Sequence, residues 1–422
     1  MQKRFLSLLL ILSVIFAAGC AKKTSTQEHD PKAKPTIVKN SMTFTELGKT
    51  GMKVSELGLG CACFEKLDST QSYDFMTVAL DSGINYLEIW NANPAVRDRI
   101  GYALKDRRDR INIQGPIGGY WTGSDNDRTR DVAQCKAAFE DLLKRLGTDH
   151  IEVGMIHIVD SKDEWNEIKE SPYMDYVKQL KKDGKIKHVG LSCHNAEVAY
   201  EAVQSGIVEV LMFSINPAFD LLPADLSAWD SKSYDNTFTN IDPIRTKLYN
   251  YCEEHGIGIV AMKAFGGGRL LDAQQSPLGT ALTPSQCIAY ALSRPGVDIA
   301  LCGANTVDEL KQDLHYLHAT DAEKDYSKAL SSCEKACWKG ECIYCGHCAP
   351  CPQDIDIDRV NKLLSIAKMY EESEIPQSIK DEYSRLKHHA SECTQCGACE
   401  SRCPFAVPVR ENMKEAARIF GK

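Results

Sequence analysis

The sequence contains no long run of lysine or arginine, and its 422 residues carry a formal net charge of −8. Proteins that bind nucleic acid usually present a basic patch to the phosphate backbone, so we expect no nucleic-acid partner. The rest of the composition is ordinary for a soluble globular protein, and the length suggests two or three domains.

The N-terminal apolar stretch, Phe5–Ala18, is too short to span a bilayer comfortably, but it has the length of a signal-peptide core. It follows a short basic segment and leads into "AAGC", which resembles a bacterial lipobox. We therefore predict a lipoprotein signal peptide at residues 1–20, a lipidated Cys20, and a flexible polar tether at residues 21–41. The predicted location is the cell envelope, with a lipid anchor to the membrane on its extracytoplasmic side; a short uncleaved anchor is the alternative.

Short apolar runs alternate with helical stretches through residues 42–320. A βα unit repeated eight times over roughly 250 residues is typical of a (β/α)8 TIM barrel. In such a barrel the catalytic groups follow the C-terminal ends of the strands. The predicted strands are Glu56–Cys61, Ile84–Ile89, Ile111–Gly115, Ile151–His157, His188–Ser192, Val208–Ser214, Gly258–Met262 and Asp298–Cys302.

Several of these segments resemble the aldo/keto reductases. "FTELGKTGMKVSELGLG" resembles their opening hairpin and first strand, "DSGINYLEIWNANPAVRDRIGYALK" their second strand and helix, and "GKIKHVGLSCHN" and "VDIALCGANTVDEL" their fifth and eighth strands. Together with a cysteine-rich C-terminal region, the chain resembles the branch of that family that carries a 4Fe–4S ferredoxin-type domain.

The resemblance implies hydride transfer from NADPH to a carbonyl, with a Tyr as general acid and a Lys, an Asp and a His as its helpers. The Tyr position falls on Asn93, the Lys position on Pro116 and the Asp position on Glu88, while the His is kept as His157. The candidate catalytic residues are therefore His157, Glu88 and Asn93. A protonated His157 with Glu88 as its partner could replace the missing acid; alternatively, His157 is only retained from an ancestral reductase.

The resemblance also implies positions for the nucleotide, and NADP(H) is a candidate cofactor. A helix N-terminus after the last strand and a glycine-rich segment after the seventh could each hold a phosphate. For the glycine-rich segment, a flexible barrel loop is the alternative. The candidate residues are Ser192, Asn195, Lys263, Arg269, Gly303, Asn305 and Thr306.

Eight of the 18 cysteines lie in two segments, "CIYCGHCAPCP" and "CTQCGACESRCP", with mostly i, i+3 spacing. Such runs ending in Cys-Pro are typical of iron–sulphur clusters, in which the fourth cysteine reaches across to the other cluster. We predict two 4Fe–4S clusters; zinc is the competing metal. One cluster is assigned to Cys342, Cys345, Cys348 and Cys403, and the other to Cys393, Cys396, Cys399 and Cys351.

Helical periodicity between the two segments predicts a small α-helical ferredoxin-like domain at residues 341–422, after a connector at residues 321–340. The function expected is an iron–sulphur oxidoreductase that couples a barrel site for NADPH or a small carbonyl or redox substrate to the clusters. Its partners would be that substrate or a redox protein. Since the usual Tyr and Lys are replaced, the alternative is a non-catalytic, lipid-anchored electron-transfer or partner-docking protein.

Overall fold

The computed structural model describes residues 42–422, except for residues 228–229, 236–237 and 334–335. The predicted signal peptide, the lipidated Cys20 and the tether at residues 21–41 lie outside the described residues. No helix within the described part of the chain is both long enough and apolar enough to span a bilayer.

Eight parallel strands close into a barrel in the order β10-β12-β13-β3-β4-β5-β8-β9, which confirms the predicted TIM barrel. Each predicted strand corresponds to one of them, and β12 has the predicted bounds. The strands are β3 Leu57–Gly60, β4 Tyr86–Glu88, β5 Asn112–Ile117, β8 Ile151–Ile156, β9 Ile186–Cys193, β10 Val210–Ser214, β12 Gly258–Met262 and β13 Val297–Cys302.

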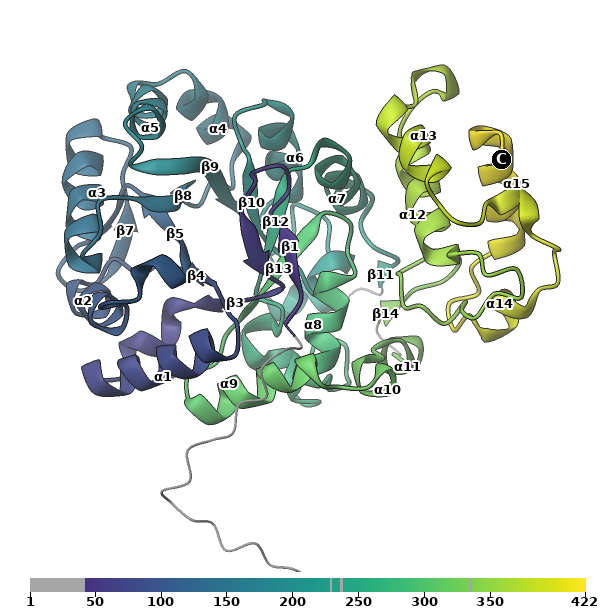
Figure 1. Ribbon diagram of the computed structural model, residues 1–422, viewed down its shortest axis with the longest axis horizontal. Helices are drawn as coiled ribbons and strands as arrows, with labels where there is room; N and C mark the ends of the chain where they lie inside the picture. The colour runs from purple at the N-terminus through teal and green to yellow at the C-terminus, as the bar shows by residue number, and fades with distance from the viewer. Residues whose placement is uncertain (1–41, 228–229, 236–237, 334–335) are drawn as a thin grey trace, which may run out of the picture. The chain divides into compact units, whose positions relative to one another are not determined.

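Helices lie around the outside of the strands (Figure 1). Their apolar faces pack on the barrel, while side chains such as Val153, Met212 and Ile299 fill its interior. These helices are α1 Ser69–Asp81, α2 Pro94–Ala103, α3 Val132–Leu146, α4 Lys162–Lys169, α5 Pro172–Lys182, α6 Ala196–Gln204, α7 Pro243–His255, α8 Pro284–Leu292 and α9 Val307–Leu314.

A hairpin of β1 (Phe44–Glu46) and β2 (Lys53–Ser55) covers the N-terminal end of the barrel. Its turn inserts Leu47 into the interior core, and the Gly48 N–H donates to Asp298 at 2.8 Å. Gly48 has φ +53°, and a Cβ there would lie 2.3 Å from the Gly258 nitrogen. Only glycine can therefore bring this turn so close to the barrel strands.

Two regions expected to be irregular contain short strands. The loop at residues 118–130 is a hairpin of β6 (Gly119–Trp121) and β7 (Asn126–Arg128). In the connector, helices α10 (Asp321–Lys324) and α11 (Ser327–Ser331) precede β14 (Ala336–Cys337), which pairs with β11 (Phe238–Thr239). Backbone pairing, within a hairpin for β6 and β7 and with a distant segment for β14, overrides the polar, turn-rich composition of these regions.

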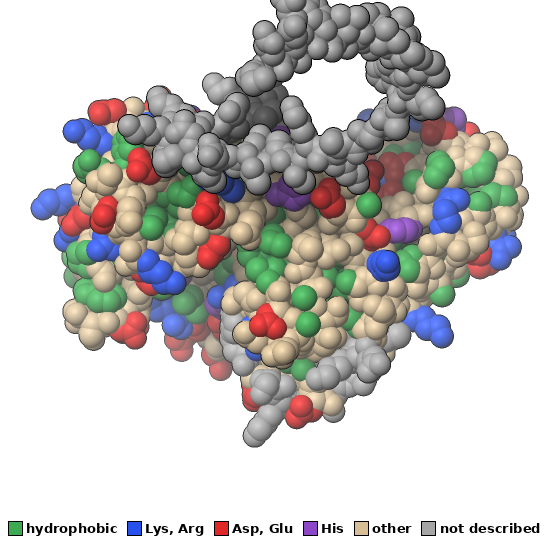
Figure 2. All heavy atoms as spheres, turned by 90° about the horizontal axis from the view of Figure 1, so that it is seen from below, with side chains coloured by type: hydrophobic (Ala, Val, Ile, Leu, Met, Phe, Trp, Pro, Cys, Tyr) green, Lys and Arg blue, Asp and Glu red, His purple; other side chains and the backbone are tan. Residues whose placement is uncertain are grey.

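The C-terminal region is helical, as predicted. Helix α12 packs against α13, α15 and barrel helix α7, and Arg359 on α12 pairs with Glu253 on α7 at 3.0 Å. The remaining helices are α12 Ile357–Ala367, α13 Gln377–Ser384, α14 Ala398–Arg402 and α15 Val409–Phe420. On the face of the molecule drawn in Figure 2, basic and acidic side chains are intermixed.

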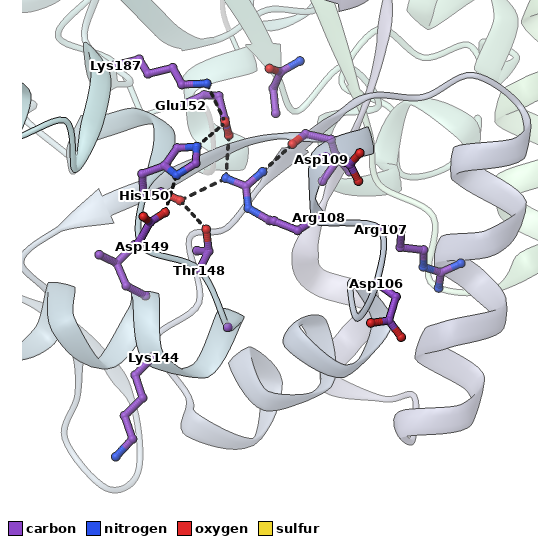
Figure 3. Close-up of a pocket in the computed structure, with 14 residues that line it drawn as sticks. Asp106, Arg107, Arg108, Asp109, Lys144, Thr148, Asp149, His150, Glu152 and Lys187 are labelled. Carbon is purple, nitrogen blue, oxygen red and sulfur yellow. Dashed lines mark hydrogen bonds and ion pairs between the residues drawn. The ribbon is translucent and has the colours of Figure 1, made fainter.

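A network of charged side chains lines an open groove of about 880 Å³ at the N-terminal end of the barrel. Glu152, whose side chain is 5 % exposed, pairs with Arg108 at 2.9 Å, Lys187 at 3.3 Å and His150 at 3.4 Å (Figure 3). Burial raises the pKa of the Glu152 carboxyl, but the Ile113 N–H and Arg108 outweigh burial and hold this pKa below its usual value. This end of a TIM barrel mainly serves stability.

We expect Glu152→Gln to lower the free energy of unfolding by about 2 kcal/mol at pH 7, because the buried carboxylate gives up its charge-assisted bonds to Arg108 and to the Ile113 N–H. Since the folded-state pKa of Glu152 is depressed, the difference disappears as the pH falls through that pKa. Urea denaturation followed by circular dichroism measures both effects. The matched control is Asp149→Asn, an exposed carboxylate beside His150; an equal loss in this control would contradict the assignment.

Candidate functional site

The C-terminal ends of the strands surround a cavity of about 710 Å³, a size typical of small-molecule sites. Its floor is apolar and includes Met212, Met262 and Leu301 from the barrel interior. Six of the residues predicted to act here line it: Glu88, His157, Ser192, Lys263, Gly303 and Asn305. We call this cavity the barrel mouth.

His157 follows β8 and is 9 % exposed. Burial, reinforced by the nearby Arg130, lowers the pKa of its imidazole to about 3, so it is neutral at physiological pH. The Ser192 hydroxyl accepts from the Ile158 N–H at 2.7 Å and lies 3.3 Å from His157 Nδ1. This arrangement favours donation from Ser192 to Nδ1, which leaves the imidazole proton on Nε2. The expected role of a protonated His157 as the acid does not agree with this environment.

The backbone beside His157 is strained. Ile158 has φ +48°, a conformation that β-branched residues rarely adopt. Arg130 holds the segment by donating to the His157 carbonyl at 2.7 Å, and it pairs with Glu164 at 3.1 Å. Such strain is maintained where a site needs a fixed geometry, so Arg130 positions the imidazole, a role that sequence reasoning missed.

Glu88 ends β4 and is 5 % exposed. Burial raises the pKa of its carboxyl to about 8, and the nearby Lys263 ammonium only partly opposes the rise. Burial in turn lowers the pKa of Lys263, opposed by Glu88 and Asp160. Lys263 follows β12 with φ +59°, another strained position. At neutral pH the barrel mouth therefore contains a protonated carboxyl beside a lysine. This lysine follows a different strand from the one that carries the lysine position of the family that the chain resembles.

Lys263 was expected to bind phosphate, and its partnership with Glu88 was missed. Glu88 is the last residue of β4 and Lys263 directly follows β12, and the C-terminal ends of all eight strands lie at one end of a barrel. That signal could have paired them. Alignment of single positions with the family could not reveal the proximity of Lys263 to Glu88, because the family's lysine position falls on Pro116, within β5.

Three predicted residues are helix caps outside the cavity lining. The Asn93 carboxamide accepts from the Ala95 N–H at 2.9 Å and begins α2. Asn195 caps α6 and donates to the Ala224 carbonyl at 3.1 Å. Thr306 accepts from the Glu309 N–H at 3.1 Å and caps α9. These polar groups are used to begin helices.

The two predicted phosphate positions differ from expectation. At the start of α9, the Glu309 carboxylate accepts from the Asn305 N–H at 2.7 Å, so the chain's own anion occupies this N-terminus. Glycines 266–268 all have positive φ and form a turn beside the mouth, but Arg269 is not among the lining residues. Buried Asp313 and Cys302 also line this side, and burial raises the pKa of Asp313 to about 7.

The eight C-terminal cysteines gather around two small cavities, and none of them forms a disulfide. Cys403 joins the first segment and Cys351 joins the second, as the crossed assignment predicts. The first cavity is lined by Cys342, Cys345, Cys348 and Cys403 with apolar residues such as Phe405. The second is lined by Cys351, Cys393, Cys396 and Cys399 with apolar residues such as Met413.

Residues 56–285, more than half of the chain, match the model of the aldo/keto reductase family. The chain belongs to the aldo/keto reductase family. Residues 338–407 match a 4Fe-4S dicluster domain, so this family member is an aldo/keto reductase-like oxidoreductase with an iron–sulphur domain.

Relatives of the barrel support this assignment. The uncharacterized oxidoreductase YqkF of Bacillus subtilis is 23 % identical over 69 % of this chain and 96 % of its own length. Another from that organism, YrpG, is 30 % identical over 36 % of this chain, which spans about half of that relative. The fold is similar to aldo-keto reductase AKR11C1 from Bacillus halodurans in its holo form, with TM-score 0.53 and 22 % identity over 67 % of this chain and 94 % of the other.

The residues fit iron–sulphur clusters better than they fit a dinucleotide. Free thiols are the ligands that such clusters use. No described group of three or more His, Cys, Asp or Glu is arranged for a single metal ion; thiols around a cluster lie farther apart, because iron and sulphide separate them. Among the positions expected for NADP(H), Asn195 and Thr306 are helix caps and the Asn305 N–H is bonded to the Glu309 carboxylate, so we derive no step through nicotinamide.

We expect Cys403→Ser and Cys342→Ser to lose the same cluster, because both thiols line the first cavity despite their separation in sequence. Cys351→Ser should instead lose the second cluster, as Cys396→Ser does. EPR spectra of the reduced variants after anaerobic reconstitution, with iron and sulphide analysis, distinguish the two clusters. The crossed arrangement is wrong if Cys403→Ser loses the same EPR signal as Cys396→Ser.

Proposed function

We propose that this chain is an oxidoreductase in which two 4Fe–4S clusters, reduced by a partner redox protein, deliver electrons to a small carbonyl or other redox substrate bound at the barrel mouth. The observation that carries the proposal is the combination of two cavities with four cysteines each and a mouth that contains Glu88, a buried carboxyl with a pKa of about 8. When bound, the clusters would supply the electrons singly, so two of them provide the pair that a carbonyl requires.

The residues of the mouth are suited to proton delivery. Reduction of a carbonyl to an alcohol consumes two electrons and two protons. Glu88 holds one proton at neutral pH and can donate it to the substrate oxygen, and Lys263 stabilises the carboxylate left behind. The Nε2–H of neutral His157 can orient the same oxygen. The second proton comes from solvent through the open side of the mouth.

The second candidate function is electron transfer to a docked partner without chemistry at the barrel. The replacement of the family's Tyr by Asn93 and of its Lys by Pro116 favours this candidate. The two functions differ in one observable: only the first makes the reoxidation of the reduced protein depend on a small substrate and on Glu88.

We expect the full chain, solubilised in detergent and anaerobically reconstituted, to oxidise reduced methyl viologen when a suitable aldehyde or ketone from a panel is added. Glu88→Gln should lower this rate at least ~100-fold, the usual contribution of a general acid, without changing cluster EPR. The wild-type rate should fall as the pH rises through about 8, because Glu88 then loses its proton.

The control is Glu167→Gln, which changes an exposed carboxylate on α4 and should leave the rate unchanged. Intact clusters with no substrate-dependent oxidation across the panel would favour the electron-transfer function instead. Addition of NADPH should not bleach the oxidised clusters; bleaching would show that a dinucleotide is bound after all.

We also propose that the mature protein is anchored to the cell envelope membrane by a lipid on Cys20. The apolar core at residues 5–18 and the following "AAGC" support this. We expect Cys20→Ala to abolish incorporation of labelled palmitate and to release the protein from the membrane fraction. Unchanged labelling in this variant would contradict the assignment.

A further inference from the structure

Arg294, just beyond helix α8, is a fully buried cation that points away from the barrel mouth and toward the C-terminal cysteines. It is 1 % exposed. Its Nη2 donates to the Ile343 carbonyl and to the Ser293 hydroxyl, the latter at 2.9 Å, and its Nε donates to the Tyr290 carbonyl at 3.3 Å. Its Nη1 has no hydrogen-bond partner among the described residues.

No carboxylate among the described residues forms a direct ion pair with this guanidinium, although Glu341 and Asp220 interact with it at longer range. Asp220, the fully buried carboxylate of this region, pairs with Arg245 at 3.4 Å and accepts from Tyr249 and Tyr290 at 2.6 and 2.8 Å. None of the ion pairs formed by the described residues includes Arg294. Burial of a charge without a partner is costly, and proteins normally avoid it.

The contacts of Arg294 lead directly to one of the two cysteine cavities. Ile343 follows Cys342 and lines the first cavity with it. The Ile343 carbonyl also accepts from the Tyr326 hydroxyl at 2.8 Å. The guanidinium lies over the ring of Tyr344, 5.2 Å from its centroid, and over that of Tyr290 at 4.4 Å. Both rings keep water away from the charge. The second cavity is lined by a different kind of cation: Arg410 is half exposed and pairs with Glu400 at 2.7 Å.

We propose that Arg294 is the counter-charge of the cluster held by Cys342, Cys345, Cys348 and Cys403, and that it raises the reduction potential of this cluster against the opposing effect of Asp358, which lines the same cavity. This inference rests on the proposed function, since it requires both clusters. Thiolate ligation makes a cluster site negative, and uptake of one electron adds one further negative charge. A buried positive charge favours the reduced state, because charges interact strongly where water is excluded.

The consequence is a direction for electron flow. Arg294 follows a barrel helix and contacts the backbone of the first cysteine segment at Ile343. Its charge would make the first cluster a better electron acceptor, and would therefore favour the transfer of an electron from the second cluster to the first. Arg294 acts as a positioning and tuning residue, because it touches neither substrate nor cluster ligand side chains.

The test is an EPR-monitored redox titration of the reconstituted full chain, with dithionite as the one-electron reductant. We expect Arg294→Met to lower the midpoint potential of one cluster only, so that at the wild-type midpoint the ratio of reduced to oxidised cluster falls about tenfold, which is ~59 mV for a one-electron couple. The affected signal should be the one that Cys342→Ser removes. Arg294→Lys, which keeps the charge, should restore most of the potential.

Arg359→Gln is the matched control, because it removes another arginine that joins the C-terminal region to the barrel, through Glu253, but does not contact Ile343. Both midpoints should stay unchanged in this control. If Arg294→Met fails to retain iron, Arg294→Gln decides, since it keeps a donor for the Ile343 carbonyl and removes only the charge. Unchanged potentials in an iron-loaded Arg294→Met or Arg294→Gln overturn the proposal. Absence of two cluster signals in the wild-type protein would instead overturn the proposed function.

Discussion

The convergence of eight thiols from two separate segments is the constraint on which the C-terminal region depends. This region is small, and its helices α12 to α15 enclose the two cavities beside an apolar core that includes Val360 and Met413. Thiol groups that face a shared cavity without forming disulfides need a soft metal centre to occupy it. The helices, the turns around the cysteines and the contacts with α7 all keep these groups in place.

The barrel keeps the architecture of its family but has different residues at the family's catalytic positions. Its strands, its closing hairpin and His157 are those of an aldo/keto reductase, whereas the phenol and the lysine of the family's positions are absent. Glu88, at the family's Asp position, and Lys263, from a different strand, place a buried carboxyl and a cation in the same cavity. The Glu309 carboxylate also differs from what a nucleotide site needs, because it fills a helix N-terminus that could otherwise receive a phosphate.

Much of this arrangement could be predicted from the sequence. Apolar runs with the spacing of βα units identified all eight strands, and the Cys-Pro endings predicted which cysteine crosses to which cavity. What could not be predicted depends on distances between side chains that are far apart in sequence. The Glu88–Lys263 pair joins β4 to β12, and Arg294 reaches the Ile343 carbonyl across 49 positions. Asn93 was assigned to catalysis and Asn195 to nucleotide binding, although carboxamides directly before a helix are more often caps.

The exchange of one cysteine between the two segments means that neither cavity is a self-contained unit. Cys351 and Cys403 each close the cavity whose other three thiols come from the opposite segment. Loss of iron from either side, for instance on exposure to oxygen, would free one end of both segments at once. Damage would therefore spread to the neighbouring centre instead of remaining local, and repair would have to rebuild the two centres together.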